Sequence, residues 1–212
     1  MPMNKKRFIP HNLLSSIDLH RKNDRIFIKK QLYTFDSFVV GAGNRSAHAA
    51  ALAVSGSLGA AYNPLFIYGE RGLGKTHLLG AIGNHIQAQN KRAKIIVSSP
   101  SSFMNETNNG AHSAKLDKYY AMIRKADVLL IDDFQVMAGV ISIRKEFLHT
   151  VELLHERRTL IVITSDRMPG DIPELDSRLL ARIDDGIMEV IQPPYFMLRR
   201  YDENHYEWHR KN

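Results

Sequence analysis

Eight consecutive residues of this chain have the types and the spacing of a loop that binds phosphate groups. The pattern G-x-x-x-x-G-K-[ST] begins at Gly69 and contains Gly72 as an additional glycine. Glycines such as Gly74 let backbone amides approach phosphate oxygens, while the Lys75 ammonium supplies positive charge and the Thr76 hydroxyl can ligate Mg²⁺. An apolar run precedes the loop and a helical pattern follows it, so the N-terminal dipole of that helix also favours an anion. The sequence therefore predicts a site for a nucleoside triphosphate.

Carboxylates that suit such a site follow two other apolar runs. Asp132 and Asp133 come directly after residues 129–131, and Asp166 comes shortly after residues 160–164. In phosphate-loop ATPases, carboxylates at this position hold Mg²⁺ and orient water. We therefore assign Asp132 to the metal, and Asp133 to the attacking water as a general base. Asp166 is the candidate for sensing the terminal phosphate. The alternatives are a helix N-cap for the pair and an ordinary turn residue for Asp166.

The elements that must position these residues alternate between strands and helices. Such alternation is typical of an α/β fold with a parallel sheet, helices on both faces, and ligands at the carboxyl ends of the strands. We predict a five-stranded parallel sheet of the P-loop NTPase class. The expected strands are residues 65–68, 94–97, 128–131, 160–164 and 186–190, and the expected helices are residues 44–55, 76–86, 115–125 and 143–156.

Composition limits the class of protein and its surroundings. The 212 residues are 44% hydrophobic, contain no cysteine and include no apolar stretch of membrane-spanning length or secretory h-region, so we expect a cytoplasmic protein. The net charge of +7 is concentrated near the N-terminus, where residues 1–30 carry eight Lys and Arg against two Asp. We expect a basic arm at 1–32, a nucleotide-binding domain at 33–194 and a polar tail at 195–212. The arm could contact DNA or acidic lipid, or be a solvated leader.

Several segments of the sequence together resemble the AAA+ ATPase domain of the bacterial chromosomal replication initiator family, DnaA. The resemblance runs from Tyr33 to Pro194. The segments that carry it are residues 33–41, 44–45, 47–51, 63–68, 72–78, 129–135, 147–150, 164–167 and 191–194.

The resemblance implies a module that binds ATP or ADP with Mg²⁺ and assembles with other subunits of its kind on origin DNA at the start of replication. By position, Asp166 is similar to the family's sensor 1, and Arg182 to the arginine finger that reaches a neighbouring subunit's ATP. The remaining residues that the resemblance implies are Gly69, Gly72, Gly74, Lys75 and Thr76 at the phosphates, Asp132 and Asp133 at Walker B, and Val39, Val40 and Gly41 near the base.

The sequence also departs from the family pattern. The family's lid and helix-turn-helix domain do not fit in the last eighteen residues, so we expect at most slow hydrolysis. Glu70 puts negative charge in the phosphate loop. Residues 140–142 stand where the family usually carries basic residues that grip single-stranded DNA, and residues 108–110 interrupt the companion helix. Two alternatives stay open: a helicase-loader or transposase-helper ATPase, and a non-enzymatic, lidless regulator of a full-length initiator.

Overall fold

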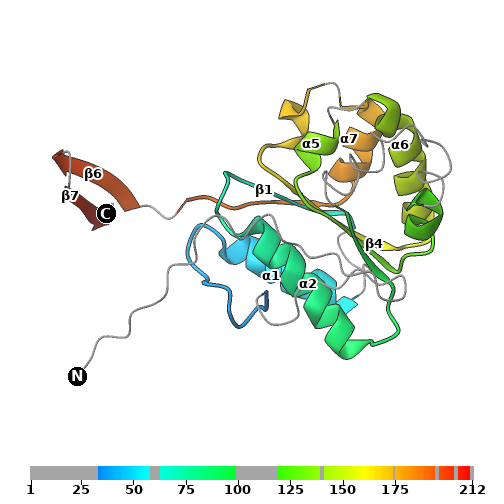
Figure 1. Ribbon diagram of the computed structural model, residues 1–212, viewed down its shortest axis with the longest axis horizontal. Coiled ribbons are helices and arrows are strands. Elements are labelled where there is room, and N and C mark those ends of the chain that lie inside the picture. The colour runs from blue at the N-terminus through cyan, green and yellow to red at the C-terminus, as the bar shows by residue number, and fades with distance from the viewer. Residues whose placement is uncertain are drawn as a thin grey trace.

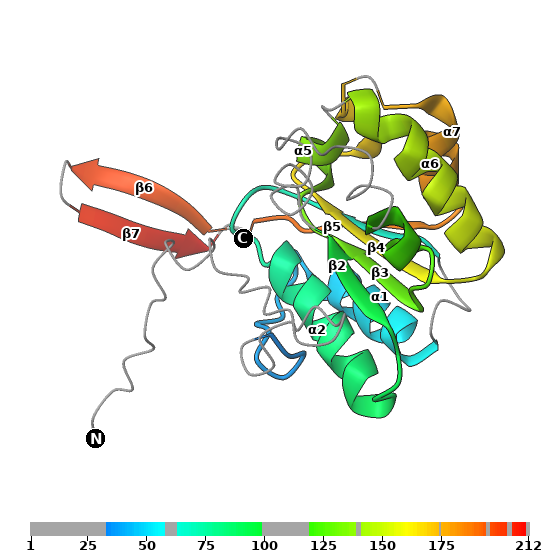
Figure 2. The same ribbon diagram turned by 45° about the vertical axis from the view of Figure 1, so that its right-hand side comes forward.

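The computed structural model describes residues 33–57, 63–98, 119–138, 141–173, 175–193, 196–202 and 205–210. At 137–138, 141–147, 196–202 and 205–210 it describes the backbone alone. Its centre is a sheet of five parallel strands (Figures 1 and 2). In spatial order they are β2 (Ile95–Ser98), β3 (Val128–Ile131), β4 (Leu160–Ser165), β1 (Leu65–Tyr68) and β5 (Ile187–Val190). The basic arm and the segment at 108–110 lie outside the described residues.

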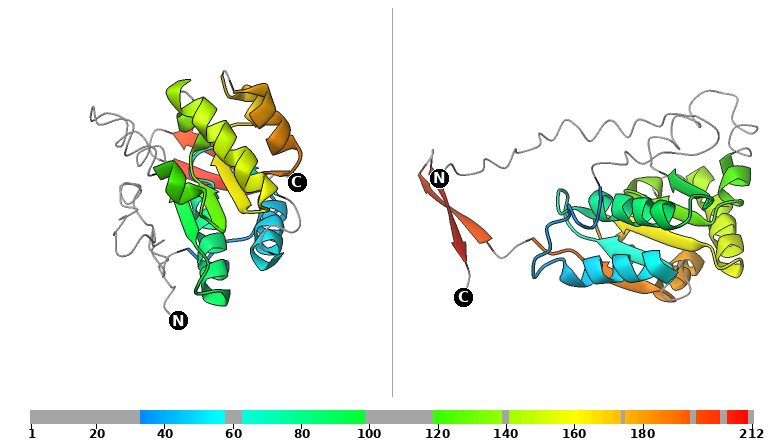
Figure 3. Two further views of the ribbon diagram at one scale, coloured as in Figure 1. Left: turned by 90° about the vertical axis from the view of Figure 1, so that its right-hand side faces the viewer. Right: turned by 90° about the horizontal axis from the view of Figure 1, so that it is seen from below.

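Helices cover both faces of this sheet. Figure 1 shows α1 (Arg45–Ser57) and α2 (Lys75–Gln89) on one face, and α5 (Phe134–Ala138), α6 (Ile141–Glu156) and α7 (Ser177–Asp184) on the other. The left view of Figure 3 shows the same three layers from another direction. The short 3₁₀ helix η2 (Pro169–Asp171) leads from β4 toward α7. The predicted α/β class, with five parallel strands between two helical layers, is confirmed.

The strands form where the sequence has short, almost wholly apolar runs, because a parallel sheet covered on both faces has no solvent side. All four residues of β3 are buried, and alternate residues face opposite layers. Leu129 and Ile131 belong to the apolar core that includes side chains of α6 and α7, whereas Val128 and Leu130 belong to the core under α1 and α2. One strand thus supports both layers of helices.

The observed elements lie within a few residues of the expected ones. The strands at 65–68 and 128–131 have the expected bounds, while β4 continues to Ser165 and α6 begins at Ile141. Of the helix expected at 115–125, residues 119–123 are helical and 115–118 lie outside the described residues. No helix in the described part of the chain has the length and apolar character needed to cross a membrane.

The order of the strands brings distant parts of the sequence to one edge of the sheet. β4 lies between β3 and β1, and the register pairs Ile131 with Ile163 and Tyr68 with Ser165. Since all three strands run in the same direction, the residues that follow them emerge side by side. The phosphate loop, the Asp pair and Asp166 therefore meet at this edge.

The segment expected as a polar tail contains a β-hairpin. Strand β6 (Phe196–Asp202) pairs with β7 (His205–Arg210) in a separate antiparallel sheet of two strands. Its sequence shows no clear apolar alternation, and we expected it to be a polar tail. Pairing between strands is supplied by the partner strand and is not visible in the periodicity of either strand alone.

Candidate functional site

The phosphate loop begins directly after β1 and has the backbone geometry that requires glycine. Gly69, Gly72 and Gly74 have φ values of 152°, 83° and 95°, a region that other residues rarely adopt. A Cβ at Gly69 would also lie 2.3 Å from the carbonyl oxygen of Ile191, so a side chain is excluded there. The loop then leads into α2, whose first residue is Lys75. The predicted loop therefore has the predicted strand and helix on either side.

Lys75 is the charged group at the centre of this loop. Its side chain is buried, with 6% of its surface exposed, and Nζ donates to the carbonyl oxygens of Gly69 at 2.7 Å and Glu70 at 2.8 Å. Burial lowers the pKa of Lys75, while the carboxylates of Asp133, Asp132 and Asp166 act in the opposite direction.

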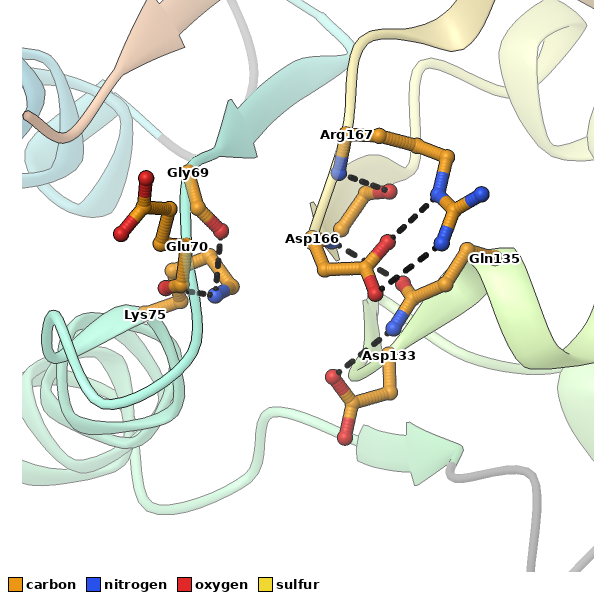
Figure 4. A network of polar contacts seen from close by, with 8 residues as sticks. Gly69, Glu70, Lys75, Asp133, Gln135, Asp166 and Arg167 are labelled. Atoms are coloured by element: carbon orange, nitrogen blue, oxygen red, sulfur yellow. Dashed lines mark hydrogen bonds and ion pairs between the residues drawn. The ribbon is translucent and has the colours of Figure 1, made fainter. Parts of the chain in front are cut away.

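The Glu70 side chain points away from the Lys75 ammonium. Figure 4 shows the Glu70 carboxylate on the opposite side of the loop backbone from the Lys75 ammonium. Only the backbone carbonyl of Glu70 contacts Lys75 in the described structure. The negative charge that the sequence places in the loop is therefore directed away from the ammonium.

Asp132 is a buried carboxylate held by two hydroxyl groups. It is 5% exposed, its Oδ1 accepts a hydrogen bond from Thr164 Oγ1 at 2.5 Å, and the Thr76 side chain also bonds to it. Burial raises the pKa of Asp132, and the neighbouring Asp133 acts in the same direction against the bonds from Thr164 and Thr76. The fold thus brings Thr76 at the start of α2 together with Asp132 at the end of β3, as predicted.

This pair suits a hard divalent cation. Among the described residues, no group of three or more His, Cys, Asp or Glu could enclose a metal ion. Mg²⁺ commonly uses only one or two protein oxygens and fills its other positions with water and substrate phosphates. A buried carboxylate next to a hydroxyl is a donor set of that kind, so Thr76 and Asp132 fit Mg²⁺.

Asp133 follows in an unusual backbone conformation. Its φ is 52°, in the left-handed region that non-glycine residues adopt infrequently and Asp more readily than most. Its amide donates to Thr164 Oγ1 at 3.2 Å, and its Oδ1 accepts from Gln135 Nε2 at 3.3 Å. Of the three carboxylates around Lys75, Asp133 has the strongest electrostatic effect on that ammonium. Asp133 is exposed, so its carboxylate is accessible to water.

Asp166 lies at the end of the neighbouring strand and pairs with the next residue. Arg167 Nε donates to Asp166 Oδ1 at 2.7 Å, as Figure 4 shows. The Arg167 guanidinium lowers the pKa of Asp166, with smaller contributions from Arg71 and Lys75 on the phosphate loop. Asp166 is therefore an ionised group within electrostatic reach of the loop.

Arg182 is the predicted site residue that the fold does not bring to this edge. It lies on α7, 44% of its side chain is exposed, and Nη1 bonds to Asp185 Oδ2 at 3.1 Å. Within the part of the chain that the structure describes, no contact joins Arg182 to the phosphate loop. One turn earlier on the same helix, Arg178 pairs with the N-cap residue Asp176.

The predicted base-binding segment lies beside the loop. The Phe38 ring is so close to the loop that Cε2 would lie 2.8 Å from a Cβ placed on Gly74. The following Val39 and Val40 are 80% and 43% exposed, an unusual amount for valine. Gly41 is fixed through its amide, which donates to Asn44 Oδ1 at 2.7 Å. The segment thus presents apolar surface next to the phosphate loop.

Three residues that touch these groups received no role from the sequence. Thr164 bonds to the Asp132 carboxylate and to the backbone amide of Asp133, Gln135 contacts the Asp133 carboxylate, and Phe38 packs on Gly74. All three lie within the segments that carry the resemblance to the initiator family. The residue types alone do not show which side chain makes a contact between the ends of two neighbouring strands.

Comparisons with known proteins agree with this geometry. The family model described as the bacterial DnaA ATPase domain matches residues 29–190. The chromosomal replication initiator protein DnaA of Geotalea uraniireducens is 54% identical over 162 residues, which are 76% of this chain and 36% of that protein. The matched part of this chain therefore spans about a third of the length of such curated relatives.

Solved structures show the same relationship. Domain III of the Thermotoga maritima replication initiation protein DnaA has a TM-score of 0.72 and 40% identity, covering 77% of this chain and 68% of that one. A replication initiator DnaA bound to AMPPCP and single-stranded DNA has a TM-score of 0.70 and 35% identity, covering 76% and 50% of the two chains. By its fold, its site and these comparisons, the chain belongs to the bacterial DnaA ATPase-domain family.

Proposed function

We propose that this chain is an initiator-type AAA+ module that binds ATP or ADP together with Mg²⁺. The observation that carries the proposal is the meeting of Lys75, the Thr76 and Asp132 pair, and Asp166 at one edge of the sheet. A structural relative with AMPPCP bound supports it. The closeness to initiators disfavours the alternative of a helicase-loader or transposase-helper ATPase.

Each part of the site has a distinct task in this proposal. The amides of the glycine loop and the Lys75 ammonium hold the phosphates, and the α2 N-terminus adds its dipole. Thr76 and Asp132 hold Mg²⁺, which when bound neutralises charge on the phosphate oxygens. The apolar segment Val39, Val40 and Gly41 lies against the nucleotide base. The exposed valine side chains would then be covered by the aromatic ring of the base and no longer by water.

Hydrolysis requires a positioned water as well as a bound triphosphate. Asp133 is the carboxylate that orients this water, because it is exposed and faces the charge of Lys75. Asp166 is the residue that senses the terminal phosphate from β4. We expect turnover to be slow in the chain on its own, since a complete electrostatic cage for phosphoryl transfer usually includes cations from other elements or subunits.

A thermal melt with and without nucleotide tests the binding part of the proposal. A ligand that binds only the folded state at 100 times its Kd stabilises that state by about 2.7 kcal/mol. For a chain of this size the midpoint should then rise by roughly 5–10 °C. ATP with Mg²⁺ should raise it more than ATP with EDTA. A melt unaffected by ATP, ADP and Mg²⁺ would contradict nucleotide binding.

Arg182 is proposed to act on another subunit. Its guanidinium is half exposed and held only by a surface pair with Asp185, so it is available at the molecular surface. A basic group presented in trans to a γ-phosphate is the device that AAA+ subunits and GTPase activators share. Assembly with initiator subunits on DNA follows from this proposal, with an initiator bound to single-stranded DNA as a structural relative.

We therefore expect Arg182→Ala to leave this chain's own ATP affinity unchanged while lowering hydrolysis in mixtures with an initiator whose own arginine finger is intact. Arg178→Ala, one turn earlier on α7, is the matched control and should leave hydrolysis in the mixture unchanged. ATP turnover of the mixture, measured at several mixing ratios, checks this expectation. Equal turnover with Arg182→Ala and Arg178→Ala would refute the finger. A chain that suppresses turnover regardless of Arg182 would instead be the non-enzymatic regulator.

A further inference from the structure

We infer that Gln135 is a positioning residue that ties the Asp133 carboxylate to the end of β4. Gln135 lies in the first turn of α5, two residues after Asp133, and it is half-buried. Its Nε2 donates to Asp133 Oδ1 at 3.3 Å, and its Oε1 accepts from the backbone amide of Asp166 at 3.2 Å. Figure 4 shows the side chain between these two groups. One amide thus bridges the carboxyl ends of β3 and β4.

The chemistry of the bridge requires an amide. The backbone N–H of Asp166 can only donate, so the group facing it must accept; the carboxylate of Asp133 can only accept, so the group facing it must donate. At neutral pH only the amides of glutamine and asparagine carry a donor and an acceptor side by side in a planar group, and asparagine is shorter by one methylene. Glutamate in this place would keep the contact with Asp166 and set a negative oxygen against Asp133.

The bridge acts on a residue whose conformation needs support. A left-handed φ of 52° at Asp133 is unfavourable for a non-glycine residue and persists where surrounding contacts determine it. Thr164 Oγ1 accepts a hydrogen bond from the Asp133 amide, and Gln135 Nε2 donates one to Oδ1 of the Asp133 carboxylate. Gln135 therefore restricts the direction in which the Asp133 carboxylate points.

The consequence for hydrolysis rests on the proposed function, whereas the bridge itself does not. If Asp133 orients the attacking water, a misdirected carboxylate should slow the chemical step while leaving the phosphate loop intact. Nucleotide affinity depends on Lys75, Thr76 and Asp132, none of which is bonded to Gln135 among the described contacts. The expected signature is a loss of turnover without a loss of affinity.

Two variants and a control separate these effects. In nucleotide-free protein, Gln135→Ala should accelerate hydrogen exchange of the Asp166 amide about 10-fold or more, whereas Gln135→Glu should preserve its protection. In single-turnover hydrolysis with Mg²⁺, Gln135→Glu should slow the reaction about 10-fold or more, with the ATP Kd changed by less than about 3-fold. The ratio of Gln135→Glu to wild-type turnover should rise as pH falls, because a protonated carboxyl can donate to Asp133. Gln89→Glu, on the exposed end of α2, should match wild type throughout.

These measurements separate a failure of the proposed function from a failure of the Gln135 bridge. If the wild-type chain does not bind ATP, the proposed function fails, and the exchange of the Asp166 amide still decides the bridge. Wild-type exchange in Gln135→Ala would overturn the inference whether or not ATP is hydrolysed. Equal turnover of Gln135→Glu and wild type at every pH, in a chain that does hydrolyse ATP, would overturn it as well.

Discussion

Replacing Lys75 with alanine should lower the affinity for ATP by about 100-fold or more, which corresponds to ~2.7 kcal/mol. The Lys75 ammonium is buried and fixed by two carbonyl oxygens of the loop, so it is already oriented and partly dehydrated. A preorganised charge of this kind contributes more to phosphate binding than a mobile surface lysine. Titration with a fluorescent ATP analogue, in the presence of Mg²⁺, measures the effect.

Two controls keep this result interpretable. Lys91→Ala removes an exposed lysine beyond the C-terminus of α2 and should leave the affinity unchanged. A cooperative melt of nucleotide-free Lys75→Ala shows that the variant is folded. Equal affinity in wild type and folded Lys75→Ala would show that the glycine loop is not the nucleotide site.

The second large effect is expected at Asp132, where stability and function should change in opposite directions. Replacement by asparagine keeps the shape and an oxygen that can accept from Thr164, but removes a buried negative charge. We expect Asp132→Asn to abolish the additional nucleotide stabilisation that Mg²⁺ provides. In nucleotide-free protein at pH 7–8 the same change should increase the free energy of unfolding by about 0.5–2 kcal/mol.

The sign of the stability effect follows from the raised pKa of Asp132. In the unfolded chain an Asp carboxyl loses its proton near pH 3.9, whereas the folded chain retains that proton to a higher pH. Between the two pKa values the unfolded state binds fewer protons, so the wild-type free energy of unfolding falls as pH rises through this window and stays lower above it. The advantage of Asp132→Asn should therefore grow as pH rises and vanish below the window.

Urea unfolding at a series of pH values, alongside melts with ATP and either Mg²⁺ or EDTA, measures both effects. Asp184→Asn, which removes an exposed carboxylate on α7, should change neither the pH profile nor the response to Mg²⁺. An Asp132→Asn variant that keeps the full Mg²⁺-dependent stabilisation would remove Asp132 from the metal site. A variant that is less stable than wild type at pH 7–8 would show that the carboxylate is not penalised by burial.

The sequence by itself determined the fold class and the members of the candidate site. Short apolar runs such as 65–68 and 128–131, bounded by turn residues, are typical of strands buried on both faces. The glycine pattern at 69–76 is recognisable because its glycines meet a local backbone requirement. The positions after the apolar runs likewise marked Asp132, Asp133 and Asp166, since parallel strands end at one edge. These features are local, so a single sequence displays them.

The tertiary structure decided what depends on the order of strands and on contacts between them. Only the placement of β4 between β3 and β1 makes Thr164 and Gln135 into bridges across strand ends, and only that packing buries Lys75 and Asp132 enough to shift their pKa values. It also set Arg182 apart from the phosphate loop, a separation that spacing along the chain does not reveal. Burial, strand order and cross-strand hydrogen bonds join residues far apart in sequence, and no local pattern of residue types specifies them.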